Sequence, residues 1–478
     1  MKKLISLCII AIFVLTMFAA QAPRRANAQS FGVAWDSSIQ VLNLDSDFAA
    51  NISIYYYNPD GSLATLVSPY LNPVEDTVAI GVSNTYFPIH ADAGFEGSVV
   101  ISSDRDIAVI SNLVVNTTAK GLGSYVGFKQ GDDKIFFPLL MKDNPTANTS
   151  TSMFSVQNTG DTEAAITIEF TPEVGSSYPA IADIADTLPV GAAHNYDLSQ
   201  LTQFAGVTRW VGSATVSVTD TVNDSIAGVG VTVNVKFPDA FQLATYNAFI
   251  KGSTTVKLPL IQENNSGNRT SVNCQNIDPA ITSNITITYV PEAGSSAKAP
   301  ETKTNISPNG IAVFLQDYLG ATKFVGSATV TSSPAVPMVC VVNQQKPAVG
   351  RYSAYEGFDP ADASDTVVLP LIQSRNGTIP NGFVYTTINV ATADGASHTV
   401  TCDYKPAPGF TDPTNDGLTG STLVFSQADV YGTGAKFVGG AVCSTSDASS
   451  IFAIVNQTRQ NPPQPTRDIL SSYDGFNQ

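Results

Sequence analysis

The sequence predicts an all-β protein made of several similar sandwiches, and three observations lead to this prediction. Only 13% of the 478 residues are charged, whereas about 25% is usual, and the missing Lys, Glu and Arg are the residues that cover helix surfaces. Ser, Thr, Asn, Val and Ile dominate instead, which is typical of strands. A short phrase also recurs four times at nearly equal intervals. At about 100–200 residues per domain, the chain is long enough for several hydrophobic cores.

The recurring phrase is an aromatic residue followed by a small, glycine-containing segment. Its copies are Phe95–Val99, Trp210–Ala214, Phe324–Ala328 and Phe437–Ala441, and their central glycines lie 115, 114 and 113 residues apart. A strand-like segment with period-two alternation precedes each copy, and an apolar run ending in Asn and a Tyr-x-x-Phe motif follow it. This order predicts four units of about 113 residues, each an Ig-like β-sandwich of roughly seven to nine strands.

We therefore expect four tandem Ig-like domains in a linear array behind an export signal. The expected boundaries are 1–28 for the signal peptide, 29–131 for a first unit with an incomplete first strand, 132–252, 253–363 and 364–478. Two sets of aromatic residues, one from the phrase and one from the closing motif, are predicted to be buried. They are Phe95, Trp210, Phe324 and Phe437, and Tyr125, Tyr246, Tyr355 and Tyr473.

The first 28 residues have the pattern of a secretion signal. Lys2 and Lys3 precede an apolar run at 4–20, and Ala26–Ala28 supplies the small residues of a cleavage site. An uncleaved anchor is the alternative, because Arg24 and Arg25 after the run are unusual. No other stretch is apolar over the 18 or so residues of a membrane helix. We expect a secreted, extracellular or cell-surface protein without a transmembrane segment in its mature chain.

The charge balance excludes some partners. Lys and Arg number 24 against 40 Asp and Glu, which gives −16, and removal of the four basic residues of the signal takes this to −20. Such an acidic surface repels nucleic acid and anionic lipid. A net charge also keeps an exported protein soluble, and this is the simpler explanation of the chain's negative net charge.

The chain contains no catalytic motif, and we expect a protein that is not an enzyme. It has no nucleophile elbow, no zinc-protease helix motif and no phosphate-binding loop, and its three histidines fall in different units, where single exposed side chains explain them. A pair of carboxylates for glycoside hydrolysis stays open, because sequence does not show their separation. No cofactor is predicted. Calcium is the one metal suggested, by the loop at 412–417 and by acids at two unit junctions, Asp132 and Asp133, and Asp359, Asp362 and Asp365. Solvated turn acids are the alternative.

Four cysteines follow the signal, and an even number in an exported chain favours disulfides. When the repeats are aligned, Cys402 falls at the position of Ile168 and Cys443 at that of Val216. Both positions lie on the apolar face of their strands. We therefore predict a Cys402–Cys443 bridge that joins the two sheets of the fourth unit through its core. Cys274 and Cys340 would then pair in the third unit.

Several phrases in fixed order resemble a tandem Ig-like repeat of bacterial secreted and cell-surface proteins. They include Phe137–Lys142, Val156–Gly160, Trp210–Ala214 and Ile226-Ala227, and the resemblance extends from about Phe31 to the end of the chain. It implies an Ig-like fold and an extracellular location. The family is largely uncharacterised, so the resemblance carries over no catalytic residues.

These observations predict an extracellular structural protein, a subunit of a surface layer, sheath or filament. A carbohydrate-binding or adhesive cell-surface protein, with surface polysaccharide as its partner, is the alternative. The Leu-Pro-Leu strand occurs in three copies for four units, and the first unit lacks it. We therefore expect a strand around Phe31, Val33 and Trp35 to add head to tail to the fourth unit of the next subunit, giving self-association. The alternative is that loops cap both edges.

Overall fold

The computed structural model describes residues 10–15, 35–92, 94–116, 120–144, 150–237, 240–292, 294–316, 322–348, 350–378, 382–411, 416–427, 436–460 and 469–477. Their strands form eight sheets, all with antiparallel pairing between neighbours, and 3-10 turns occur at Thr202–Phe204 and Pro360–Asp362. The all-β prediction is confirmed. None of the described residues forms a helix long and apolar enough to cross a membrane.

The eight sheets pack as four face-to-face pairs, named here in chain order as the first to fourth sheet pairs. The first pair holds β1 (Ile10–Leu15), β6 (Glu96–Ser103), β3 (Ala50–Tyr57) and β4 (Val74–Val78) against β5 (Ser83–Tyr86), β2 (Trp35–Asn43), β7 (Ile107–Asn116) and β8 (Lys120–Val126). The second pair holds β12 (Ile184–Leu188), β11 (Ala164–Pro172), β14 (Trp210–Val218) and β9 (Lys134–Lys142) against β13 (Ala193–Asp197), β10 (Ser150–Asn158), β15 (Ile226–Phe237) and β16 (Ala240–Asn247).

The third and fourth pairs follow the same order with small additions. The third pair holds β17 (Thr255–Glu263), β22 (Phe324–Ser333), β19 (Ser283–Pro291) and β20 (Glu301–Ile306) against β21 (Ile311–Leu315), β18 (Arg269–Asn276), β23 (Met338–Lys346) and β24 (Arg351–Glu356). The fourth pair holds β29 (Asp416–Gly420), β28 (His398–Pro406), β31 (Phe437–Thr445), β25 (Thr366–Ser374) and β34 (Phe476–Asn477) against β26 (Asn376–Thr378), β27 (Gly382–Thr392), β32 (Ile451–Gln460) and β33 (Ile469–Asp474), with β30 (Thr422–Ser426) on β27.

The cores lie between the sheets of each pair, and the period-two pattern places them there. In β11, for example, Ile166, Ile168 and Phe170 are buried while the residues between them face outward. All eight aromatic residues predicted to be buried are at most 8% exposed. This prediction is confirmed.

Two features of the structure explain why the phrase recurs: close backbone packing at its glycine, and a contact between neighbouring sheet pairs at the next residue. A side chain at its glycine would overlap the neighbouring strand: a Cβ at Gly212 would lie 2.2 Å from the Thr171 carbonyl oxygen, and one at Gly326 would lie 2.1 Å from that of Val290. The next residue reaches the following sheet pair, as Ser213 Oγ does when it donates to the Asn309 carbonyl at 2.6 Å. Each copy of the phrase therefore serves both the packing within its sheet pair and the contact with the next pair.

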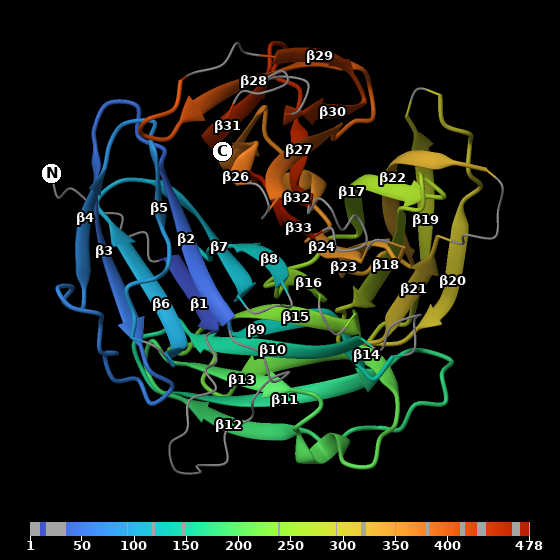
Figure 1. Ribbon diagram of the computed structural model, residues 1–478. Coiled ribbons are helices and arrows are strands. Elements are labelled where there is room, and N and C mark those ends of the chain that lie inside the picture. Colours follow the sequence, from blue (N-terminus) through green and yellow to red (C-terminus); the bar gives the residue numbers. More distant parts are fainter. Residues whose placement is uncertain are drawn as a thin grey trace, which may run out of the picture.

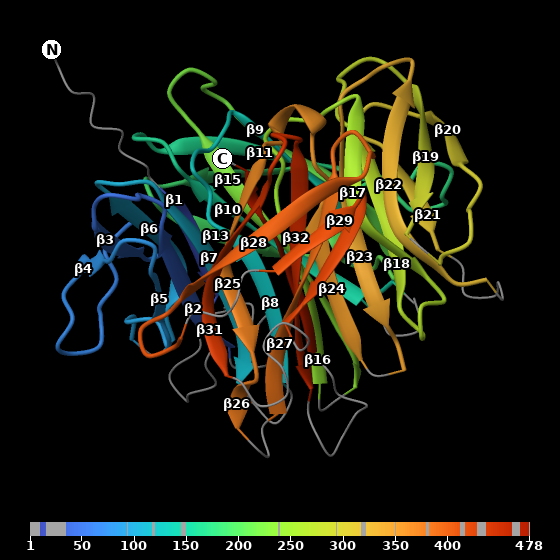
Figure 2. The ribbon, with the colours of Figure 1, turned by 90° about the horizontal axis from the view of Figure 1, so that it is seen from above.

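The four sheet pairs form a closed ring, and the predicted linear array is wrong. Figure 1 shows them around a common centre, from blue through green and yellow to orange, and Figure 2 shows the central strands β8, β16 and β24 side by side. Strand β8 contacts β16, β16 contacts β24, β24 contacts β33, and β33 contacts β8 again. The closure is hydrogen-bonded, because Ser471 Oγ on β33 donates to Ser124 Oγ on β8 at 2.8 Å.

Small residues on the four central strands allow this closure. A Cβ at Gly123 of β8 would lie 2.6 Å from Thr245 Cγ2 of β16, so only glycine fits there without movement. The hydroxyl of Thr245 donates to the Ser124 carbonyl at 2.6 Å. A linear array would leave these small, polar strand faces without partners, and the ring buries them against one another.

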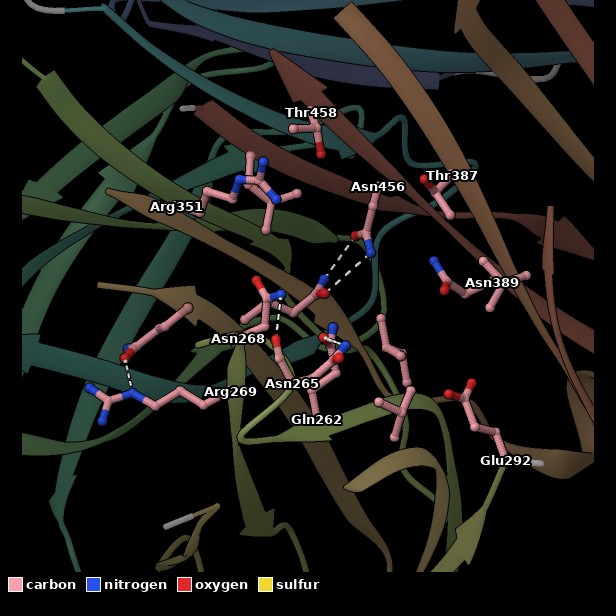
Figure 3. Close-up of a pocket in the computed structure, with 16 residues that line it drawn as sticks. Gln262, Asn265, Asn268, Arg269, Glu292, Arg351, Thr387, Asn389, Asn456 and Thr458 are labelled. Atoms are coloured by element: carbon pink, nitrogen blue, oxygen red, sulfur yellow. Dashed lines mark hydrogen bonds between the residues drawn. The ribbon is translucent and has the colours of Figure 1, made fainter. Parts of the chain in front are cut away.

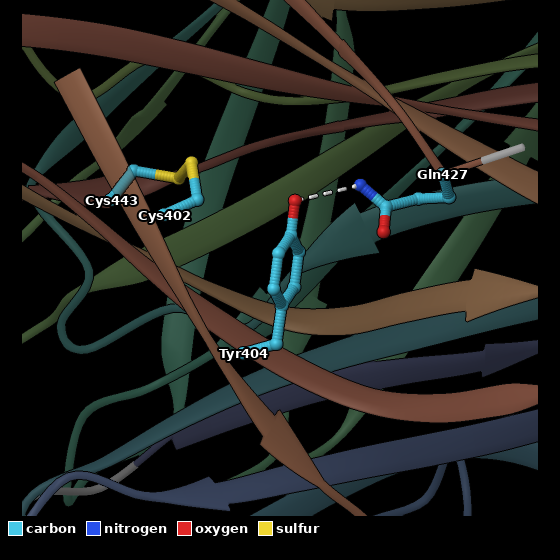
Figure 4. Close-up of a disulfide and its surroundings, with 4 residues drawn as sticks. All are labelled: Cys402, Tyr404, Gln427 and Cys443. Carbon is cyan, nitrogen blue, oxygen red and sulfur yellow. Dashed lines mark hydrogen bonds between the residues drawn. A yellow bond between two sulfur atoms is a disulfide. The ribbon is translucent and has the colours of Figure 1, made fainter. Parts of the chain in front are cut away.

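Both predicted disulfides are present, Cys274–Cys340 and Cys402–Cys443. The expectation that the second bridge joins two sheets is wrong, because Cys402 on β28 lies directly opposite Cys443 on β31 in one sheet. The two Cα atoms are 4.0 Å apart, close to the spacing of directly opposed residues in an antiparallel pair. Figure 4 shows the bridge beside Tyr404, whose hydroxyl accepts a hydrogen bond from Gln427 Nε2 at 3.2 Å.

Candidate functional site

A cleft of about 440 Å³ lies between the third and fourth sheet pairs. It collects amide side chains from strands that are far apart in the chain, and Figure 3 shows them facing one another. Gln344 of β23 and Asn456 of β32 form a reciprocal amide pair across the junction, with donor–acceptor distances of 2.9 and 3.2 Å. The third sheet pair adds Gln262 and the turn at Asn265–Asn268. This is a polar cleft whose walls come from two sheet pairs.

The cleft contains an unsatisfied donor. Asn389 on β27 is 4% exposed, lines the cleft, and its Nδ2 has no hydrogen-bond partner. A buried amide without a partner is unfavourable by about 1–3 kcal/mol. Its neighbours on the wall are Thr387 on the same strand and Val424 of β30, which lies opposite Asn389. The amide nitrogen is itself buried, so an acceptor oxygen of a bound molecule would satisfy it once the side chain turns towards the cleft.

Charges and apolar side chains complete the lining. Arg269, Arg351 and Glu292 come from the third sheet pair, and Arg269 Nε donates to Gln345 Oε1 at 3.1 Å. Apolar surface comes from both sheet pairs; it consists of Leu260, Val325, Val424 and Leu470. Among the described residues that line this cleft there is no histidine, cysteine, serine or lysine.

A second cleft of the same construction, about 290 Å³, lies between the fourth and first sheet pairs. Its residues occupy the same places in the repeat, since Gln373 and Asn376 follow a Leu-Pro-Leu-Ile segment as Gln262 and Asn265 do. Gln373 Nε2 donates to Gln457 Oε1 at 2.8 Å. The junction contact also repeats: Gln457 Nε2 donates to Ser124 Oγ at 3.0 Å, as Gln344 Nε2 does to the corresponding Ser472 Oγ at 2.9 Å.

Two carboxyl groups meet near the centre of the ring, where the central strands end. This region opens into a cavity of about 550 Å³. It is lined by the residue after each closing tyrosine, namely Val126, Asn247, Glu356 and Asp474. The backbone NH of Asn247 donates to Glu356 Oε1 at 2.6 Å, and the backbone NH of Glu356 donates to Asp474 Oδ2 at 3.0 Å. Burial raises the pKa of Glu356 to about 7. Burial, and then the neighbouring Glu356 carboxylate, raise the pKa of Asp474 well above its usual range.

The three histidines are paired or stacked, not solitary and exposed as the sequence suggested. His194 Nδ1 lies 2.8 Å from Asp186 Oδ2, and His90 stacks on Tyr70 with ring centroids 3.8 Å apart. His398 lies between Asp394 and Asp447, at 2.9 and 2.7 Å, and these hydrogen bonds raise its pKa. The three lie in different parts of the ring, and none lines either amide cleft.

The predicted assembly strand is only partly described. Trp35 is 1% exposed and begins β2, where it lies opposite Val115 of its own chain. It is therefore part of the first sheet pair's own core. Phe31 and Val33 lie outside the described residues, so the assembly strand stays a prediction for them.

The acids predicted for calcium are not brought together in the described part of the chain, where no group of three or more His, Cys, Asp or Glu has metal-site geometry. Asp362 pairs with Lys251 at 2.6 Å, and Asp359 accepts a hydrogen bond from the backbone of Ala361. Most of the loop at 412–417, residues 412–415, lies outside the described residues.

Sequence reasoning missed the amide clefts and the central carboxyl pair. The signals were present: Leu-Pro-Leu-Ile-Gln with Asn three residues later occurs twice, at 258–265 and 369–376, and Val-Asn-Gln occurs at 342–344 and 455–457. The residue after each closing tyrosine is also readable from the repeat. What the sequence could not show is that a ring brings these positions together.

No protein-family model and no curated protein matches the chain. Among solved structures, the crystal structure of Thermotoga maritima 1070 is similar to part of it, with 18% identity, 25% of this chain and 94% of that chain covered, and a TM-score of 0.20. A tetra-tandem repeat from the extending region of a large adhesion protein is 12% identical, with 93% and 95% covered and a TM-score of 0.11. Neither similarity is high enough to support a conclusion about this chain.

Proposed function

We propose that the protein is an extracellular, non-enzymatic binding protein, in which four Ig-like domains close into a ring and the clefts between them hold a polyhydroxylated ligand such as a saccharide. The observation that carries the proposal is the amide-lined cleft with the unpartnered Asn389 amide. The next junction repeats the amide lining, with Gln373, Asn376 and Gln457.

The chemistry of the lining supports this ligand class. A side-chain amide has both donors and an acceptor, and a sugar hydroxyl also both donates and accepts, so the two match in many orientations. Leucine and valine side chains offer apolar surface to the C–H faces of a sugar ring. A volume of about 440 Å³ is within the usual range of small-molecule sites.

Export is supported by two disulfides, which persist in oxidising compartments. The sequence of residues 1–28 supports it as well. The role as a subunit of a surface layer, sheath or filament stays a prediction. Head-to-tail addition to the fourth unit is disfavoured, because the fourth and first sheet pairs contact each other within one chain.

The proposal is tested by calorimetric titration of the mature chain with neutral oligosaccharides of glucose, mannose and N-acetylglucosamine. We expect Asn389→Leu to weaken binding at least tenfold in the first cleft, and Gln373→Leu to weaken it in the second. Thr187→Val, at an exposed position of β12, is the control and leaves binding unchanged. Binding that is unaffected by both cleft substitutions, or no binding to any of these sugars, would refute the saccharide assignment.

A further inference from the structure

The first sheet pair holds a strand that removal of the predicted signal peptide would take away. Strand β1 pairs with the outer edge of β6 from Ile10 opposite Ile101 to Leu15 opposite Glu96. All of β1 lies within the predicted signal peptide, so its removal leaves that edge of β6 without a neighbour.

The same position is filled in the other three sheet pairs by a strand of one kind. Strand β9 lies on β14, β17 on β22 and β25 on β31, and each carries a proline between large apolar residues. Their register matches that of β1 at the glycine of the phrase, where Val14 lies opposite Gly97 as Ile261 lies opposite Gly326. The three other strands have a register shift next to this point, and β1 pairs without one. We name this position the edge slot.

Strands β9, β17 and β25 each supply core side chains. In β17, Leu258 and Ile261 are 0% exposed and Leu260 is 5% exposed. An empty slot therefore exposes the core of the first sheet pair as well as the unpaired backbone of β6.

The mature chain cannot refill the slot itself. Cleavage after Ala28 leaves six residues, 29–34, before β2 begins at Trp35. The connection from the slot strand to the next strand takes residues 143–149 in the second sheet pair and 264–268 in the third. Connections of seven and five residues leave at most one of these six, which is too few for a strand.

We propose that the edge slot on β6 is an acceptor for a strand from another polypeptide, an extended apolar segment with a central proline of the kind that fills the three equivalent slots. The strand adds by main-chain hydrogen bonding and inserts its alternate apolar side chains into the core. This inference rests on the export and leader removal that belong to the proposed function, and is independent of what the amide clefts bind.

The experiment uses the chain from residue 29 and a fluorescent peptide with the sequence of Thr255–Glu263. The peptide should bind at one site per chain and raise the thermal unfolding temperature. A peptide carrying Leu258→Asp and Ile261→Asp should bind at least tenfold more weakly. A chain with residues 255–268 copied in front of Trp35 has its slot filled in cis, and should not bind the peptide.

Equal binding to the filled and unfilled chains, or no binding to an unfilled chain that is folded, would overturn the proposal. Where the unfilled chain does not fold alone, refolding it with the peptide should give the circular dichroism spectrum of the filled chain. Failure to do so overturns the proposal that a strand from another polypeptide fills the slot. Titration of the filled chain with oligosaccharides reports on the clefts separately. Mass spectrometry of the exported protein reports separately on leader removal.

Discussion

Replacement of Glu356 by Gln should make the protein more stable above pH 7 than the natural chain. The backbone NH of Asn247 donates to Glu356 Oε1, and an amide oxygen can accept the same bond. The new amide NH2 can donate towards Asp474, whose Oδ1 is buried without a partner. The variant thus keeps the acceptor and removes a carboxyl group that is costly to ionise in this place.

The magnitude follows from the pKa of Glu356. Burial raises it from the ordinary 4.5 to about 7, and the corresponding free energy is roughly 3 kcal/mol. Below pH 4.5 both folded and unfolded chains hold the proton, so this contribution to stability is fully present. As the pH rises to 7 the unfolded chain releases the proton first, and the contribution is lost by the time the folded chain releases it. The raised pKa of Asp474 acts in the same direction.

The assay is urea unfolding of the natural chain and the variant between pH 4 and pH 8.5. Over this pH range the free energy of unfolding should fall by up to about 3 kcal/mol more in the natural chain than in Glu356→Gln. Glu169→Gln, at an exposed position of β11, is the control for loss of one charge. Parallel pH curves for the natural chain and Glu356→Gln, or a Glu356→Gln chain that is the less stable at pH 8, would refute the reasoning.

Three further predictions concern the cores and the ring. Removing the bridge by the double change Cys402→Ser and Cys443→Ser should cost roughly 4 kcal/mol, because it opens a loop of 41 residues, and urea unfolding of oxidised chains measures this loss. Phe324→Ala should cost about 3–5 kcal/mol, since the side chain is 2% exposed, and a loss under about 1 kcal/mol would contradict its place in the core. Gly123→Val should lower the free energy of unfolding by about 1–3 kcal/mol, because the new side chain overlaps Thr245 Cγ2. Adding Thr245→Ser should recover part of this loss, whereas Thr245→Ser by itself should not stabilise the protein. Additive effects of the two substitutions would mean that the central strands do not touch there.

The sequence predicted the interior of each sheet pair well. Period-two alternation identifies the strands, and repetition identifies equivalent positions, which is why the eight buried aromatic residues and both cysteine pairs were found. The repeat also aligned Cys402 and Cys443 with Ile168 and Val216, and these are opposed on neighbouring strands, as the cysteines are. Assigning them to two different sheets was wrong because columns of an alignment carry no information on which strands are hydrogen-bonded.

The ring and the sites at its junctions were decided by tertiary structure. Repeats with equal intervals fit a linear array and a closed ring equally well, since local patterns report burial within a unit and not the angle between units. Closure depends on side chains about 330 residues apart, such as Gln457 and Ser124, and each looks like an ordinary polar residue on a strand. The amide clefts and the Glu356–Asp474 pair exist only because that angle brings the same place in neighbouring repeats together. The sequence alone determined what each sheet pair is made of, and the packing of the pairs against one another determined where its chemistry lies.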